Sequence, residues 1–347
     1  MNKIKNYNKK FYLTLLKALI VPVIAVLFII FLIFIFSDTP FNTIYFYFIG
    51  PFRNIFNIGN MINASIPYIF GALGIIIAYK AGSLNLGGEG QIYLGAFITL
   101  VLSLLFSEIG IVGAFLAAVI GALSSGVLCA FSGFCKAKWN TNELITTFLL
   151  SCAIIPVINF FVIGPFLDPD TSLLSTKKIA ENMRLTLIFK PSNLSYGILI
   201  SFVFVFFIHF FLKKTKLGYE IRMIGINEMF ARYGGINTKF NIIFSMGFSG
   251  FLYGLAGGVA VLGTYFAVIK EFSAGLGWGG LTVALIAGFS PAAVIPCALF
   301  LSWINTGARI AAQNTGFTFE IAYIIQAVIF ILSSGVTLIN NKTRGKG

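Results

Sequence analysis

Nine stretches of this chain run without a charged side chain for long enough to cross a lipid bilayer. A transmembrane helix needs about 20 mostly apolar residues, and a charge at the bilayer centre costs roughly 2.5–3.5 kcal/mol on insertion scales. Charged residues make up 10% of the chain and apolar residues 58%, whereas soluble domains carry about 25% charged residues. This balance excludes a soluble domain and a disordered chain, so the sequence predicts an all-α polytopic membrane protein. The charge-free stretches are 18–37, 54–79, 90–107, 109–135, 144–167, 191–212, 240–269, 272–308 and 321–341.

The eighth stretch, 272–308, is too long for one transmembrane helix. Ser290, Pro291 and Pro296 interrupt it, and proline breaks or kinks a helix interior, so two short helices that meet at a bend are expected here. The sequence therefore predicts about ten transmembrane helices, some of them short or broken. We expect them near residues 18–37, 62–79, 88–107, 109–131, 144–166, 195–212, 240–262, 278–290, 291–308 and 321–340.

The basic residues are distributed unevenly between the two sides of this ten-helix topology. With the N- and C-termini cytoplasmic, the inner segments hold 17 of the 24 Lys and Arg residues but 4 of the 11 Asp and Glu residues, as the positive-inside rule requires. Topology thereby explains the net charge of +13, and we predict no nucleic-acid partner. The external segment 168–194 and the cytoplasmic segment 213–239 are too short for a soluble domain. Residues 1–347 are expected to form a single transmembrane domain in contact with membrane lipid.

The N-terminal region is predicted to be a first span and not a signal peptide. Its apolar stretch 18–36 is longer than the roughly 7–15 residues of a signal core, and no small-residue cleavage site follows it. The next segment, 39–52, is uncharged and rich in Tyr and Phe, which favour the headgroup level of a membrane. We expect it to lie at the interface.

The sequence carries few signatures of catalysis. There is no phosphate-binding GxxxxGK[ST] loop, His209 is the only histidine, and no Cys or acidic cluster has metal-ligand spacing. The run from Gly275 to Gly280 matches GxGxxG, but it follows no predicted strand, so it does not indicate dinucleotide binding. We predict no catalytic residue and no metal site. Acidic residues inside the spans are nearly absent, which disfavours ion-coupled transport.

A Gly-rich polar run between the second and third spans is the clearest candidate for a solute pathway. Asn85, Glu89 and Gln91 supply hydrogen-bonding groups there, and the glycines between them allow close approach. Irregular polar backbone at membrane depth is tolerated only where protein or water satisfies it. The alternative is a tight cytoplasmic turn in which Glu89 pairs with Lys80.

The cytoplasmic segment 213–239 contains a short amphipathic helix signal. Asn227 is an N-cap candidate, and Met229, Phe230 and Tyr233 follow before a glycine stop. A short helix that exposes apolar and basic groups can dock in a groove of another protein. A solvated loop is the alternative, but it does not need the aromatic residues.

Three glycines at spacing four predict close helix packing in the seventh span. They are Gly250, Gly254 and Gly258.

Taken together, these motifs resemble those of the permease subunits of bacterial ATP-binding-cassette (ABC) importers, in the branch for simple sugars and nucleosides. Nucleoside-type members carry approximately FNIGxEGQ after the second span, and residues 84–91 read LNLGGEGQ. Sugar-type members resemble GIDLSVG at this place, which this chain lacks. Residues 142–147 (NELITT) resemble the family's NEVITT, residues 231–236 (ARYGGI) its coupling loop, and residues 279–285 (GGLTVAL) its GxAVALL run. The resemblance covers most of the chain and is strongest to guanosine and other purine nucleoside permeases.

The resemblance implies that this chain is a transporter subunit and not an enzyme. It implies a translocation pathway for nucleosides beside Asn85, Glu89 and Gln91, and no cofactor, because ATP is bound by a separate cytoplasmic ABC ATPase. It further implies a second permease subunit in a heterodimer, an external substrate-binding lipoprotein and a location in the bacterial plasma (inner) membrane. The ATPase is expected to act on the coupling loop 213–239. The loop residues expected to carry this coupling are Arg222, Asn227, Ala231, Arg232, Tyr233 and Gly235.

Other functions remain as alternatives. The nearest is a simple-sugar permease of the same branch, of the ribose or galactose type. An ATP-independent secondary transporter is less favoured, because it relies on buried acids that this chain lacks. A membrane enzyme is least favoured.

Overall fold

The computed structural model describes residues 22–188, 190–318 and 321–344. The lysines at the N-terminus and residues 18–21 of the first expected span lie outside these ranges. The described residues form α-helices, short 3₁₀ turns and one π-helical turn, and no named strand occurs among them. The α-helices are Pro22–Phe36, α2 (Pro40–Phe48), α3 (Ile55–Lys80), α4 (Gly88–Leu105), α5 (Ile111–Trp139), α6 (Glu143–Ile163), α7 (Gly197–Lys214), α8 (Lys216–Ile226), α9 (Glu228–Tyr233), α10 (Thr238–Ala260), α11 (Leu276–Ile286), α12 (Val294–Thr315) and α13 (Ile321–Arg344). The short turns are η1 (Gly50–Phe52), η2 (Ser107–Ile109), η3 (Glu181–Met183), η4 (Val261–Tyr265), which is π-helical, and η5 (Pro291–Ala293).

Seven of the described helices are long and apolar enough to cross a membrane. They are α3, α4, α5, α6, α7, α10 together with η4, and α12 together with η5. Three further apolar helices are shorter: Pro22–Phe36, α11, and the Tyr323–Gly335 part of α13. Each of the ten expected ranges overlaps one of these helices, so the polytopic all-helical fold is confirmed. Whether the three shorter helices also cross the bilayer stays a prediction.

The charge-free stretch 272–308 is broken at its Ser-Pro dipeptide, as expected. Helix α11 ends at Ile286, the chain turns through Gly288 with φ +59°, and helical structure resumes at Pro291. With 11 residues, α11 is about 16 Å long, roughly half the thickness of a bilayer core. Pro296 lies in the first turn of α12, where a missing backbone N–H costs little.

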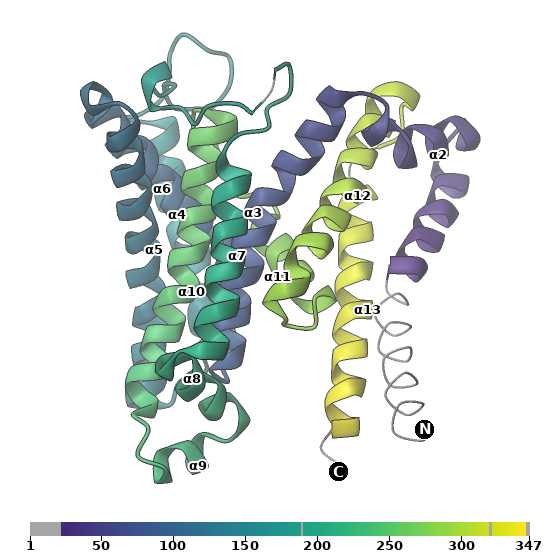
Figure 1. The fold of residues 1–347 in the computed structure, drawn as a ribbon. Helices are drawn as coiled ribbons and strands as arrows, with labels where there is room; N and C mark the ends of the chain where they lie inside the picture. The colour runs from purple at the N-terminus through teal and green to yellow at the C-terminus, as the bar shows by residue number, and fades with distance from the viewer. Residues whose placement is uncertain (1–21, 189, 319–320, 345–347) are drawn as a thin grey trace.

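The helices form two packed groups that α3 joins. Figure 1 shows α4, α5, α6, α7 and α10 gathered on one side, and α12, α13, α2 and Pro22–Phe36 on the other, with α3 running obliquely between them. The first group, α3 and α11 share the main hydrophobic core. The second group has its own core, built around Ile29, Tyr47, Ala308 and Ile325.

Small residues allow the central helices to approach closely. Gly250, Gly254 and Gly258 lie on α10 against its neighbours: a Cβ atom at Gly250 would lie 2.5 Å from a backbone oxygen of α5. A Cβ atom at Gly254 would lie 2.7 Å from the Cα of Ala122, and one at Gly258 would lie 2.9 Å from Thr99 Oγ1 of α4. Larger side chains at these positions would push α10 away from α4 and α5.

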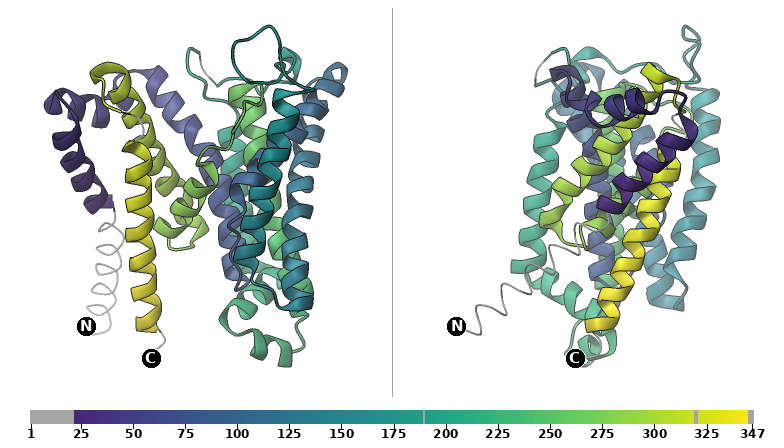
Figure 2. Two further views of the ribbon diagram at one scale, coloured as in Figure 1. Left: turned by 180° about the vertical axis from the view of Figure 1, so that it is seen from behind. Right: turned by 90° about the vertical axis from the view of Figure 1, so that its right-hand side faces the viewer.

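The two ends of the molecule differ. Helices α8 and α9 extend beyond the bundle at one end, which we call the α8–α9 end, and segment 168–194 covers the other (Figures 1 and 2). Segment 213–239 is mostly helical and not a loop, because Thr215 caps α8 through a hydrogen bond from the Gly218 N–H, 3.0 Å. The C-terminal end of α13 points to the α8–α9 end, consistent with the predicted topology.

Candidate functional site

Segment 81–87, which links α3 to α4, is held by a reciprocal pair of side-chain amides. Asn85 Nδ2 donates to Gln91 Oε1 at 2.7 Å, and Gln91 Nε2 donates back to Asn85 Oδ1 at 3.0 Å. Asn85 also donates to Ser249 Oγ of α10, 3.0 Å, and accepts from the Gly87 N–H, 2.9 Å. Both amides are fully buried. Buried polar groups must be paired in this way, so these two side chains serve as scaffold and their hydrogen-bonding groups face other protein groups.

Glu89 occupies a different position, between the start of α4 and the start of α11. Its Oε1 accepts from the backbone N–H of Gly277 at 2.8 Å and of Trp278 at 3.1 Å, and its Oε2 accepts from the Gly275 N–H at 3.3 Å. The first N–H groups of a helix lack internal partners and carry the positive end of the helix dipole. The Glu89 carboxylate therefore caps α11 and joins it to α4.

The GxGxxG run forms this contact through its backbone. Gly275 has φ +85°, which favours glycine, and a Cβ atom at Gly277 would lie 2.5 Å from the Glu89 backbone nitrogen. Small residues are therefore needed where α11 meets α4. The run binds a carboxylate of the same chain, and its resemblance to a dinucleotide motif is coincidental.

An ion pair anchors segment 81–87 from the α8–α9 end. Lys136 Nζ of α5 lies 2.8 Å from Glu143 Oε1 of α6, and it also donates to Ser83 Oγ at 2.9 Å and to the Gly82 carbonyl oxygen at 3.0 Å. Both charged side chains are only 16% exposed. Lys136 therefore ties three elements together, and the sequence analysis did not identify it. Its position seven residues before Glu143, across the α5–α6 turn, was the available signal.

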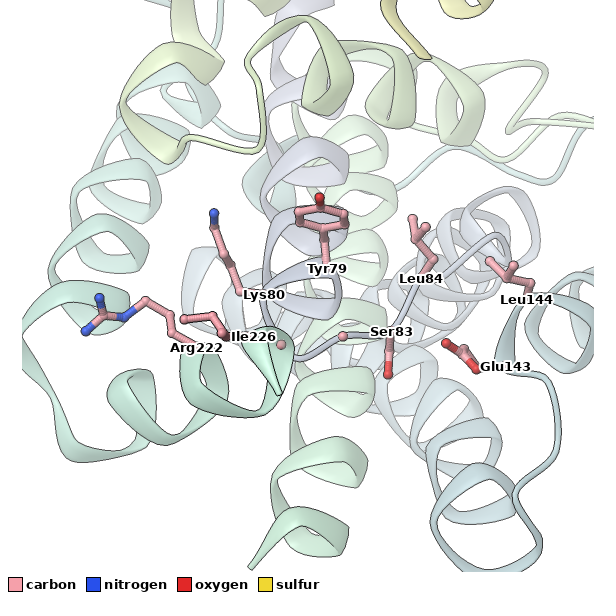
Figure 3. Close-up of a pocket in the computed structure, with 10 residues that line it drawn as sticks. Tyr79, Lys80, Ser83, Leu84, Glu143, Leu144, Arg222 and Ile226 are labelled. Atoms are coloured by element: carbon pink, nitrogen blue, oxygen red, sulfur yellow. The ribbon is translucent and has the colours of Figure 1, made fainter. Parts of the chain in front are cut away.

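A cavity of about 460 Å³ opens beside this anchor at the α8–α9 end. Figure 3 shows Tyr79 and Lys80 at the end of α3, Glu143 turned toward Ser83, and Arg222 on α8. The full lining is Tyr79, Lys80, Gly82, Ser83, Leu84, Glu143, Leu144, Arg222, Gly225 and Ile226. The cavity thus lies where α8 meets the end of α3 and segment 81–87.

Helix α9 presents an apolar surface to the outside. Asn227 caps it by accepting from the Phe230 N–H, 2.9 Å, and Gly235 with φ +81° follows its end. Ala231 is buried against Ile224 and Ile242. The side chains of Ile226, Met229, Phe230 and Tyr233 are exposed, Tyr233 by 86%. We call these four residues the apolar tip; Ile226 ends α8, and the other three lie on α9. Arg232 lies beside them and is also exposed.

The expected site residues therefore fall into two groups. Asn85, Glu89 and Gln91 lie together at the start of α4, whereas the expected coupling residues lie on α8, α9 and the turn after them. Gly225 connects the two groups, because a Cβ atom there would collide with the Lys80 carbonyl oxygen and lie 3.2 Å from the Gly82 nitrogen. The end of α8 thus packs directly on the start of segment 81–87.

A bundle with seven helices that are long and apolar enough to cross a membrane has the build of a polytopic membrane protein. Residues 57–334 match the family described as "Branched-chain amino acid transport system / permease component". The chain belongs to this family of ABC transporter permeases. It is accordingly a multi-pass protein of the bacterial inner membrane.

Three relatives are similar over most of their length. "Probable riboflavin import permease protein RfuC" of Treponema pallidum is 32% identical over 303 residues, which cover 86% of this chain and 79% of that protein. "Guanosine ABC transporter permease protein NupP" of Bacillus subtilis is 28% identical, covering 86% and 87%. "Nucleoside ABC transporter permease protein NupB" of Lactococcus lactis is 29% identical, covering 90% of each chain. All three are named as permeases, which are transport subunits and not enzymes.

Proposed function

We propose that this chain is the membrane-spanning permease of an ABC importer for nucleosides, with purine nucleosides as the favoured solutes. The support is the family, together with relatives named as guanosine and nucleoside permeases. The relative named for riboflavin import makes a flavin the second candidate. Nucleosides and riboflavin share a planar heterocycle attached to a polyhydroxylated carbon chain or ring.

The apolar tip on α9 is the single observation that best supports coupling to a separate ATPase. Apolar side chains outside the spans are costly in water unless a partner covers them, and a short helix of this kind fits a groove in another protein. We infer that Arg222, Asn227, Ala231, Arg232, Tyr233 and Gly235 build and flank this docking element, on the cytoplasmic side.

The contact between Gly225 and Lys80 supports a route by which ATPase motion reaches the membrane. A push on α9 displaces α8, and α8 lies against segment 81–87 without an intervening side chain. That segment leads to Glu89, which holds the start of α11. We therefore propose that Asn85 and Gln91 hold segment 81–87 beside the pathway and that Glu89 passes its movement to α11, in place of the direct solute contact expected from the sequence.

The proposed assembly contains a second permease, two ATP-binding domains of the ATPase and an external binding lipoprotein. The guanosine permeases NupP and NupQ of Bacillus subtilis both match this chain, NupQ at 25% identity over 69% of it. This pair supports a heterodimer. The external segment 168–194 is the surface proposed to receive the binding lipoprotein.

Uptake of radiolabelled guanosine tests the proposal. Cells carry this chain with its candidate companion permease, ATPase and binding protein, and a variant ATPase lacking its phosphate-binding lysine serves as control. We expect uptake that requires the intact ATPase and that excess unlabelled nucleoside blocks but ribose does not. Uptake of labelled ribose and not guanosine would move the assignment to the sugar branch. Uptake that persists without the ATPase and follows an ion gradient would indicate a secondary transporter.

A further inference from the structure

Arg309 is the charged side chain that lies deepest in a described span. It stands six residues before the end of α12 at Thr315, whereas every other charged side chain in the described parts of the seven candidate spans lies within one turn of a helix end. The Arg309 side chain is exposed. Charged side chains within transmembrane segments most often face a water-filled cavity or other protein groups, and Arg309 has an interaction within this chain. The charge-free stretch 272–308 ends one residue before Arg309, so the sequence alone predicts that Arg309 lies outside the membrane.

Arg309 belongs to a polar stripe along α12. Asn305, Arg309 and Gln313 are spaced by four residues and share one face of the helix. The opposite face is apolar, since Ile304 and Ala311 are buried in the second core. An amphipathic span of this kind lines an aqueous path or a polar subunit contact.

The stripe meets a set of aromatic side chains from other elements. Asn305 Nδ2 donates to the Tyr68 hydroxyl oxygen of α3 at 2.9 Å, and Arg309 follows Asn305 by about one helical turn on the same face of α12. Tyr68 also packs on α11, because a Cβ atom at Gly279 would collide with its ring.

Two more aromatic rings are exposed near the start of α11. Trp278 lies in its first turn, and Tyr323 of α13 lies 3.5 Å from where a Cβ atom of Gly275 would be. The rings of Tyr265, Trp278 and Tyr323 are 41–49% exposed. Trp278 and Tyr323 thus lie around the first turn of α11, whose Gly279 contacts the Tyr68 ring.

We propose that the face of α12 formed by Asn305, Arg309 and Gln313 contacts the solute, and that this solute is a planar heterocycle with a ring carbonyl next to an unprotonated ring nitrogen. A guanidinium group donates two parallel hydrogen bonds to such an edge, as it does to O6 and N7 of guanine. Tyr and Trp rings stack on planar bases. This inference rests on the proposed function and extends it to the solute contact.

The proposed chemistry is common to 6-oxopurines and flavins. Guanosine and inosine present O6 beside N7, and riboflavin presents a carbonyl oxygen beside a ring nitrogen. Adenosine presents an amino group there, which repels a guanidinium donor. A simple sugar has no planar edge of this kind.

The test uses the complete importer in proteoliposomes and substituted cysteines on α12. Arg309→Cys and Gln313→Cys are made in a Cys152→Ser background, since Cys152 is an exposed native thiol. Phe115→Cys is the matched control, because Phe115 is exposed and apolar on α5. Labelling by a charged, membrane-impermeant thiol reagent is measured with and without inosine, adenosine, riboflavin or ribose.

We expect both α12 positions to label faster than Phe115→Cys, and inosine or riboflavin to slow this labelling while adenosine and ribose do not. If inosine slows the labelling, the path accepts a purine, and if riboflavin slows it, the path accepts a flavin. Failure of both α12 positions to label, or their disulfide cross-linking to the second permease without protection by any solute, would overturn the proposal and make the stripe a subunit contact.

Transport by the Arg309→Lys variant provides a second readout. This variant keeps the positive charge. Lysine lacks the paired donors, so the rate of guanosine uptake at saturating binding protein should fall about tenfold, the discrimination of one bidentate contact. Arg53→Lys, at an exposed arginine before α3, should be unaffected. Unchanged uptake by Arg309→Lys overturns the inference. ATP-dependent uptake of guanosine or riboflavin by the wild-type complex tests the proposed function. The variants test only the solute contact, so the two can fail separately.

Discussion

One carboxylate, that of Glu89, joins two helices that are distant in sequence. It accepts three backbone N–H groups at the start of α11, and hydrogen bonds to an ionised acceptor are stronger than neutral ones. The same interaction keeps α11 in register with α4. The short helix α11 is thus positioned by the Glu89 carboxylate in addition to its packing in the main hydrophobic core.

The loss of stability and of uptake on replacing Glu89 should therefore depend on how many acceptor oxygens the new side chain keeps. Glu89→Ala removes both acceptor oxygens and the three hydrogen bonds that they accept, and it is expected to destabilise the folded protein by about 2–4 kcal/mol and to abolish uptake. Glu89→Gln keeps one carbonyl acceptor and should lose less stability and less uptake than Glu89→Ala. Thermal unfolding in detergent and uptake are measured together, with the exposed Glu108→Gln as control. Equal behaviour of Ala and Gln variants would contradict the cap.

The Asn85–Gln91 pair predicts a strong effect of a nearly isosteric change. Asn85→Asp replaces the Nδ2 donor by an acceptor that faces Gln91 Oε1 and Ser249 Oγ, and it buries a charge. We expect a loss of about 3 kcal/mol or more, measured as a lowered unfolding midpoint. Asn193→Asp, at an exposed position, should leave the midpoint unchanged. A folded, fully active Asn85→Asp protein would show that the pair is dispensable.

Helix α8 combines two contacts, one with α9 and one with segment 81–87. Its last residues carry Gly225, where the backbone of α3 approaches too closely for any side chain. Helix α9 in turn exposes the apolar tip while Ala231 anchors its other face. Under the proposed coupling, motion of the tip would reach segment 81–87 through backbone packing and not through a flexible side chain.

Gly225→Ala should separate docking from coupling. The added methyl forces α8 away from Lys80, at an overpacking cost of about 1–3 kcal/mol. We expect ATPase co-purification to persist while solute-stimulated ATP hydrolysis and uptake fall. Gly234→Ala is the matched control, because its Cβ atom would lie 3.4 Å from its nearest neighbour. Full coupling in Gly225→Ala would argue against this route.

Arg232→Glu addresses docking itself. It reverses a charge beside the apolar tip without touching the buried face of α9, so membrane insertion should be normal and ATPase association should weaken by about tenfold. Lys214→Glu, an equal charge reversal at the exposed end of α7, should retain the ATPase. Normal co-purification with Arg232→Glu would remove Arg232 from the docking surface.

Arg309 and Gln313 of the polar stripe of α12 are exposed. We propose that a second permease subunit encloses this stripe, since charged side chains within transmembrane segments most often face protein or a water-filled cavity. On this proposal the chain forms one half of a transport pathway.

Expression of this chain without a companion permease should consequently give no ATP-dependent uptake. The measurement compares guanosine uptake with this chain and the ATPase alone against the set that includes the companion, at matched membrane levels of this chain. Full uptake by this chain without the companion would indicate a homodimer.

The sequence by itself determined the class of fold, because charge-free stretches and proline positions act locally: they set which segments enter a bilayer and where 272–308 breaks. It also identified the N-cap at Asn227 and the exposed aromatic residues of α9, since both are local signals. The tertiary structure decided what the polar residues do. Asn85 and Gln91 are satisfied by each other, Glu89 binds backbone groups 186–189 residues away in sequence, and Arg309 lies inside a helix that continues past the last charge-free residue. Hydrogen-bond partners distant in the chain are chosen by packing, and no local pattern specifies them.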